Sequence, residues 1–183
     1  MLLDATMSTL LLVDMQERLL PAMTGGEEVV KRCAILLKAA KALGVPVSVS
    51  EQYPKGLGHT VAALKDDIGN APVFEKLAFS CWKDEGLKAH LIEHHERQRP
   101  LVILAGIEAH VCVLQTAVDL SLSGFGVFAV ADAMTSRVAS SAALALDRMR
   151  QNAVSVVNTE MVVFELLKQA GTAEFKALSA LVR

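Results

Sequence analysis

The sequence has few cysteines, few aromatic residues (4%) and little net charge, and these shortages exclude several classes of protein. Cys33, Cys81 and Cys112 are its only cysteines, and no two of them form a Cys-x-x-Cys pair. An odd number at unrelated spacings fits reduced thiols in a cytoplasm better than a disulfide framework or a structural zinc site. The net charge of −2 at pH 7 leaves no electrostatic footprint for nucleic acid or an anionic membrane.

Long hydrophobic runs and targeting signals are also missing. No apolar run approaches the roughly 18 residues that a membrane-spanning helix needs. Residues 1–16 contain neither a basic segment nor a small-residue cleavage site, so we expect no signal peptide and a cytoplasmic protein. No GxGxxG or Walker A motif follows the first predicted strand, which argues against a dinucleotide or a nucleoside triphosphate as the ligand.

What the sequence does have is a high apolar content, 52%, in a chain of 183 residues, long enough to bury a substantial core. Short apolar segments alternate with segments of helical periodicity. Strands are predicted at 8–13, 45–50, 73–74, 101–105, 126–131 and 154–157. Helices are predicted at 27–43, 60–64, 83–97, 110–124, 140–152, 159–170 and 172–182. This alternation, without repeats or linkers, predicts a single α/β domain over 1–183, with a parallel sheet between two layers of helices.

The most informative stretch runs from Leu101 to Val113. Five apolar residues without alternation, 101–105, are typical of a strand buried on both faces, and Gly106 ends that run. Apolar residues then recur at helical spacing, so Cys112 is predicted in the first turn of a helix. Unpaired N–H groups and the helix dipole favour a thiolate there. The alternative, a cysteine that is simply a small buried hydrophobic residue, stays open.

Two other residues follow extended segments. Asp14 ends the first predicted strand, and Lys76 lies among apolar residues, where burial lowers a lysine pKa unless an anion lies beside it. A turn aspartate and a surface lysine are the ordinary alternatives. Because parallel strands end at one edge of the sheet, Asp14, Lys76 and Cys112 can meet there. The thiol could then attack a carbonyl carbon, the acid could take its proton, and the ammonium could balance the charges.

Four segments together resemble the isochorismatase-like cysteine hydrolase superfamily: LLLVDMQ (10–16), FEKLAFS (74–80), LAGIEAHVCVLQTAVDL (104–120) and VADAMTSR (130–137). The EQYPKGLG loop and the GIEAHVCV turn are most similar to isochorismatase domain-containing proteins and to YcaC-like hydrolases of unknown substrate. The resemblance implies a three-layer α/β/α fold with a parallel, roughly six-stranded, Rossmann-like sheet. It maps a catalytic triad onto Cys112, Asp14 and Lys76. It also implies a cis peptide bond between Ile107 and Glu108, and an oxyanion hole made by the N–H groups of Glu108 and Cys112.

The resemblance also indicates what to expect around the triad. Metal-binding nicotinamidases of the superfamily carry an Asp-x-His pair after the second strand, and EQYPKGLGHT has none, so we expect no catalytic metal and no cofactor. Ala109 replaces a threonine found in many members, which argues against isochorismate as the substrate. We also expect no metal at the polar helix face that carries His90, His94 and His95. The residues expected to line the substrate pocket are Gln16, Tyr53, Phe79, Trp82 and His110, although core packing would equally explain the aromatic ones.

These features predict a cysteine hydrolase that cleaves a small amide at its C–N bond, or a related acyl compound, through a thioester on Cys112. The expected partners are a small-molecule substrate and, by resemblance, further copies of the chain, with no nucleic acid and no membrane. Two other classes stay open. One is a non-catalytic binding or scaffold member of the same fold, and the other is a flavodoxin-like signalling or nucleotide-binding domain.

Overall fold

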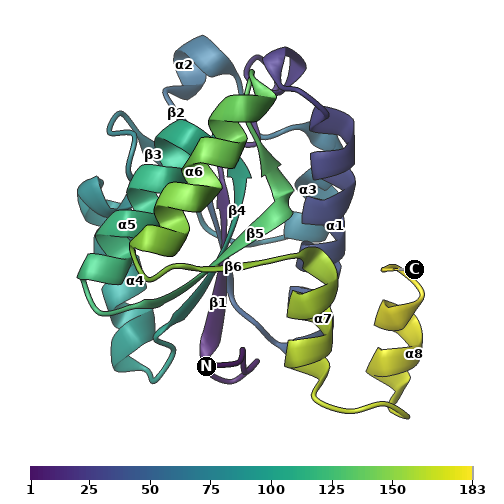
Figure 1. Ribbon diagram of the computed structural model, residues 1–183. Helices are drawn as coiled ribbons and strands as arrows, with labels where there is room; N and C mark the ends of the chain where they lie inside the picture. Colours follow the sequence, from purple (N-terminus) through teal and green to yellow (C-terminus); the bar gives the residue numbers. More distant parts are fainter. Residues whose placement is uncertain (183) are drawn as a thin grey trace.

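The computed structural model describes residues 1–182 and contains a six-stranded parallel sheet between two layers of helices (Figure 1). The strands, in chain order, are β1 (Ser8–Val13), β2 (Val47–Gln52), β3 (Val73–Lys76), β4 (Leu101–Ile107), β5 (Gly126–Thr135) and β6 (Ser155–Val157). Their order across the sheet is β3-β2-β1-β4-β5-β6, and every neighbouring pair is parallel. The predicted fold class is therefore confirmed. The order reverses between β1 and β4, which is where open α/β sheets form their ligand sites.

Helices cover both faces of the sheet, as Figure 1 shows. One side carries α1 (Gly26–Leu43), α3 (Ala62–Ile68) and α7 (Thr159–Leu167), with α8 (Ala173–Ser179) packed outside α1 and α7. The other side carries α4 (Glu85–Glu96), α5 (Leu114–Leu122) and α6 (Ala139–Gln151). Short helical turns complete the chain: η1 (Leu20–Ala22), α2 (Pro54–Leu57), η2 (Cys81–Lys83) and η3 (Ala109–Val113). None of the helices in residues 1–182 combines the length and the apolar character that a bilayer crossing requires.

The central strands have two buried faces, which explains their unbroken apolar sequences. In β1, Leu10 and Leu12 pack into the cluster that contains α1, whereas Leu11 and Val13 pack into the cluster that contains α4 and α5. All seven residues of β4 are buried as well. Burial on both sides stabilises the middle of the sheet, so the residues that directly follow β1 and β4 are held in fixed positions.

Several boundaries differ by a few residues from the sequence-based predictions, and α2 was not predicted; two differences bear on the site. Strand β5 extends to Thr135 rather than ending near Asp132, because its register against β4 shifts between Leu104 and Gly106. The predicted helix from His110 onward is divided in two: a five-residue π-helical turn, η3, comes first, and α5 begins only at Leu114. Cys112 therefore lies in this turn and not in the first turn of a regular α-helix.

Gly106 is required by the close approach of β4 to β1. Its φ is +120°, and a Cβ atom placed there would lie 2.0 Å from the carbonyl oxygen of Val13, the residue before Asp14. We expect Gly106→Ala to lower the free energy of unfolding by about 2–4 kcal/mol, through backbone strain and overpacking. Denaturant unfolding measures the loss. Gly124→Ala is the matched control, because Gly124 also has a positive φ, +89°, but a Cβ there has no neighbour within 4 Å. A similar loss in both variants would contradict the steric explanation.

Candidate active site

Strand β1 places Asp14 at the carboxyl edge of the sheet, where its side chain is fully buried. Its backbone adopts a left-handed conformation with φ of 51°. Each carboxylate oxygen has a donor: Ser50 Oγ donates to Oδ1 at 2.8 Å, and Lys76 Nζ donates to Oδ2 at 2.7 Å. A buried carboxylate is tolerated only when it is paired and hydrogen-bonded, and Asp14 meets both conditions.

Strand β3 ends on Lys76, whose side chain has no exposed surface. Its ammonium donates to Asp14 Oδ2 and to Gln52 Oε1, both at 2.7 Å, and to two backbone carbonyl oxygens of the following turn at 3.3 and 3.1 Å. Burial opposes the charged form, but the charge of the Asp14 carboxylate and its hydrogen bond outweigh burial and hold the pKa of Lys76 above its ordinary value. Lys76 is therefore a cation at neutral pH.

Cys112 projects from η3 into the same place and is only 5% exposed. Burial, and then the charge and hydrogen bonding of Asp14, raise the pKa of the Cys112 thiol, although the charge of Lys76 opposes this. The resting form is consequently the thiol, whereas the sequence predicted a thiolate at a helix start. Such a cysteine needs a base to take its proton, and the carboxylate of Asp14 lies beside it.

The turn η3 is held by the segment that follows β5. The peptide bond between Ile107 and Glu108 is cis, at the position that the resemblance implied. The Glu108 carboxylate accepts hydrogen bonds from the backbone N–H and the Nε of Arg137 at 3.2 and 3.0 Å. His110 Nδ1 lies 2.8 Å from Ser136 Oγ. These contacts therefore hold the turn against the segment that follows β5.

The family model described as the isochorismatase domain matches residues 8–161. This chain belongs to the isochorismatase family. Isochorismatase domain-containing protein 2 from Danio rerio is 40% identical over 175 residues, which cover 96% of this chain and 86% of that relative. The resemblance to isochorismatase domain-containing proteins is thus confirmed.

Two solved structures of this fold are also similar. The MAR1 ribonuclease from Caenorhabditis elegans has a TM-score of 0.92 and 35% identity, covering 100% of this chain and 92% of that chain. The ycaC gene product of Escherichia coli, described as an octameric hydrolase of unknown specificity, has a TM-score of 0.91 and 25% identity. That match covers 98% of this isochorismatase chain and 90% of the other.

Asp14 and Lys76 of the predicted triad are in direct contact in this isochorismatase domain, and the charges of both act on the pKa of Cys112. Two of the expected pocket residues have structural partners. Gln16 is fully buried and clamps the loop after β2: its Oε1 accepts from the N–H of Gln52, and its Nε2 donates to the carbonyl oxygens of Gln52 and Gly58. Trp82 packs edge-on against Phe125, with ring centroids 5.4 Å apart. Gln16 therefore has a hydrogen-bonding role within the fold, and Trp82 has an aromatic packing contact.

Of the other three expected pocket residues, Tyr53 and His110 line cavities of the isochorismatase domain, and Phe79 is exposed. Tyr53 and Lys76 line a cavity of about 620 Å³, and Tyr53 is 51% exposed. Phe79 is 54% exposed and follows closely after Lys76 in the chain. His110 lines a smaller cavity of about 300 Å³ together with Ser80 and residues of α5. The surroundings of the triad thus offer two separate cavities, one next to Lys76 and one next to His110.

Sequence reasoning missed Ser50, Gln52 and Cys81, which surround the triad. Ser50 and Gln52 come from β2, and the buried Cys81 comes from η2. A signal for the first two was present in the sequence. Alternate polar residues, Ser48, Ser50 and Gln52, share one face of a strand that flanks the centre of a parallel sheet, where apolar residues are the rule.

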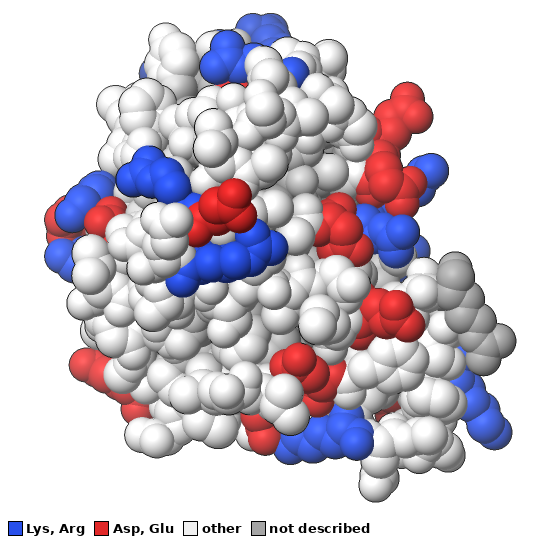
Figure 2. Space-filling view, in the orientation of Figure 1, with Lys and Arg blue, Asp and Glu red and all other residues white. Residues whose placement is uncertain are grey.

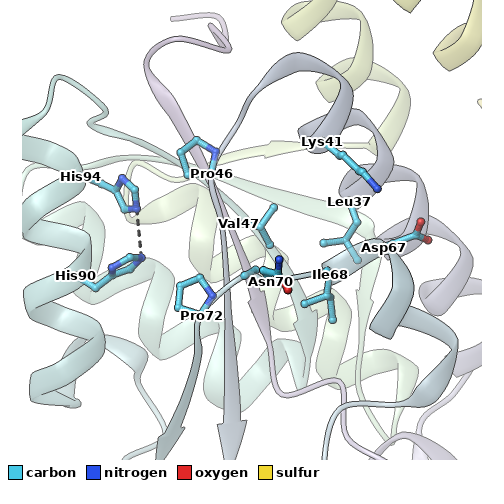
Figure 3. A pocket seen from close by; sticks show the side chains of 12 residues that line it. Leu37, Lys41, Pro46, Val47, Asp67, Ile68, Asn70, Pro72, His90 and His94 are labelled. Carbon is cyan, nitrogen blue, oxygen red and sulfur yellow. Dashed lines mark hydrogen bonds between the residues drawn. The ribbon is translucent and has the colours of Figure 1, made fainter.

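A third cavity, shown in Figure 3, lies at the opposite, amino edge of the sheet and has a volume of about 540 Å³. It is lined by the start of β2, by the loop before β3, by residues of α1 and α3, and by His90 and His94 of α4. His90 Nε2 lies 2.9 Å from Ser48 Oγ and 3.2 Å from His94 Nε2. In the part of the chain that the structure describes, no group of three or more His, Cys, Asp or Glu side chains is arranged to hold a metal ion.

Proposed function

We propose that this chain is a cysteine hydrolase that cleaves a small amide at its C–N bond, or a related acyl compound, through a thioester on Cys112. One observation carries the proposal: a fully buried Asp14–Lys76 ion pair, 2.7 Å apart, whose carboxylate also raises the pKa of the Cys112 thiol. Buried charges of this kind are expensive, and they concentrate at functional sites. Family membership supports the hydrolase class but leaves the substrate open.

The reaction follows from the positions of these groups. Cys112 Sγ adds to the carbonyl carbon, and the thiol proton passes to Asp14 while the carbonyl electron pair moves onto oxygen. The N–H groups of Glu108 and Cys112 are the proposed donors to that oxyanion. When the C–N bond breaks, the leaving amine takes the proton from Asp14 and a thioester remains. Water then attacks the thioester, giving one proton to Asp14, which returns it to the departing thiolate.

Lys76 has a supporting part in this scheme. It stays an ammonium throughout, because its neighbours hold its pKa above the ordinary value even though burial opposes this. Its bonds to Asp14 and Gln52 fix the direction of the carboxylate. The acyl chemistry thus needs only groups that this chain supplies.

The name of the Caenorhabditis elegans relative raises RNA as a competing substrate. The net charge of −2 does not favour binding to a phosphate backbone. On the face drawn in Figure 2, basic and acidic side chains are interspersed rather than gathered by sign. RNA is therefore the less favoured of the two substrate classes, and a substrate panel needs to contain both RNA and small amides.

Alkylation of the intact chain with limiting iodoacetamide tests the proposal. We expect one carbamidomethyl adduct, located on Cys112 by peptide mass spectrometry. Cys112 retains 5% exposure and has Asp14 beside it, whereas Cys33 and Cys81 have no exposed surface. Preferential modification of Cys33 or Cys81 would count against the hydrolase and favour a non-catalytic binding or scaffold protein.

The proposal includes a single hydrolase domain over 1–183, a cytoplasmic location and a homo-oligomer. The three thiols are free and buried, which suits a reducing compartment. The similar ycaC gene product is described as octameric, which supports assembly of several copies. Light scattering on a size-exclusion column distinguishes an oligomer from a chain of 19.6 kDa, and a monomer at all concentrations would contradict this part.

A further inference from the structure

Asp14 also ends a hydrogen-bond chain that the proposed reaction does not use. Ser50 Oγ donates to Asp14 Oδ1 at 2.8 Å, and Cys81 Sγ donates to Ser50 Oγ at 3.5 Å. All three side chains are fully buried. Asp14 directly follows β1, whereas Ser50 lies in β2 and Cys81 in η2, so the hydrogen bonds connect three separate segments.

Chemistry fixes the direction of these hydrogen bonds. An ionised carboxylate only accepts, so the single hydroxyl hydrogen of Ser50 points to Asp14. Burial, followed by the charge of Asp14, raises the pKa of Cys81 to about 11, so its thiol keeps its hydrogen and donates it to Ser50. Cys81 thus donates to the Ser50 oxygen, and the Ser50 hydroxyl hydrogen remains available to donate to Asp14.

We propose that Ser50, supported by Cys81, is a positioning residue that holds the Asp14 carboxylate in the orientation that faces the Cys112 thiol. This inference rests on the proposed function, in which Asp14 takes the thiol proton. A donor to the charged form of a carboxylate favours that form. Lys76 donates a hydrogen bond to the other carboxylate oxygen, Oδ2. The two donors together leave the Asp14 side chain little freedom to rotate.

The titratable groups that face Asp14 within residues 1–182 are Lys76 on β3, Cys81 on η2 and Cys112 on η3. A variant of Ser50 leaves all three in place. The pH dependence of Cys112 reactivity then reports the loss of a single donor. The acid limb of that pH profile reports the titration of the coupled Asp14–Cys112 pair and not of either residue alone.

The experiment measures the rate of Cys112 alkylation by iodoacetamide against pH, with site-resolved mass spectrometry. In Ser50→Ala, the Asp14 carboxylate loses one of its two hydrogen-bond donors. The acid limb of the reactivity profile should therefore move to higher pH. Ser50→Thr keeps the hydroxyl and should restore the wild-type profile. Cys81→Ala should give a smaller shift in the same direction, because Ser50 loses the partner that orients it.

Ser48→Ala is the matched control. Ser48 lies two residues earlier on the same face of β2 and is 1% exposed, but its hydroxyl bonds to His90 at the other edge of the sheet. Its profile should match the wild type, and thermal unfolding checks that each variant is folded. A wild-type profile in Ser50→Ala, with Cys112 still reactive, would overturn the inference. If Ser50→Ala does not fold, a Cys81→Ala variant whose pH profile of Cys112 alkylation matches the wild type would also overturn the inference. A wild-type Cys112 that is unreactive at every pH would instead overturn the proposed function.

Discussion

Replacing Cys112 by alanine is expected to lower the hydrolysis of an amide substrate by roughly 10³-fold or more, because no thioester can form. Asp14 and Lys76 remain in this variant, but an acid–base pair without its nucleophile has nothing to activate except water. The measurement is the initial rate of ammonia release from a panel of small primary amides, with both proteins purified in the same way. The panel also contains a single-stranded RNA, which has to be scored by chain cleavage.

Cys33→Ala is the matched control for this comparison. Cys33 is equally buried, but it lies on α1, where its thiol contacts the carbonyl oxygen of Ala133, on the other side of the sheet from Cys112. Its replacement should leave the hydrolysis rate at the wild-type value. Activity that survives in Cys112→Ala would show that another site or a contaminant is responsible. An inactive wild type with an unreactive Cys112 would favour the binding or scaffold class.

The order of the elements and the contact between Asp14 and Lys76 could be predicted, because both depend on local signals and one geometric rule. Continuous apolar segments indicate strands buried on two faces, as β1 and β4 are. Asp14 and Lys76 each stand at the end of an extended segment. Parallel strands share one carboxyl edge, so residues far apart in the chain arrive at the same place.

The contacts around the triad could not be predicted, because they depend on register and on turns. Ser50 reaches Asp14 only because β2 pairs with β1 in a register that sets Ser50 beside Val13. Cys81 reaches Ser50 through η2, a three-residue turn without periodicity. The prediction that a helix start favours a thiolate at Cys112 was wrong for a related reason. The helix-dipole argument is local, whereas burial and the charge of Asp14, which raise the pKa of this thiol, come from the tertiary fold.

Lys76→Met tests the electrostatic centre of this arrangement. We expect the variant to lose about 3–5 kcal/mol of unfolding free energy, because the Asp14 carboxylate stays buried without its counter-charge. Methionine keeps the length of the side chain, so packing changes little. Denaturant unfolding at pH 7 measures the loss. Lys83→Met is the matched control, since Lys83 forms a 3.9 Å ion pair with Asp119 but is 64% exposed, and such a pair contributes at most about 1 kcal/mol.

A second substitution distinguishes two causes of the expected stability loss in Lys76→Met: the loss of the ion pair and the loss of the lysine side chain itself. Asp14→Asn in the Lys76→Met background removes the unpaired charge, so the double variant should be more stable than Lys76→Met alone. Asparagine can still accept the hydrogen bond from Ser50, which keeps that contact comparable. If Lys76→Met loses no more than Lys83→Met, Asp14 does not carry a charge in the folded protein. It could then not act as the base for Cys112, and the reaction would have to begin without proton transfer to this carboxyl group.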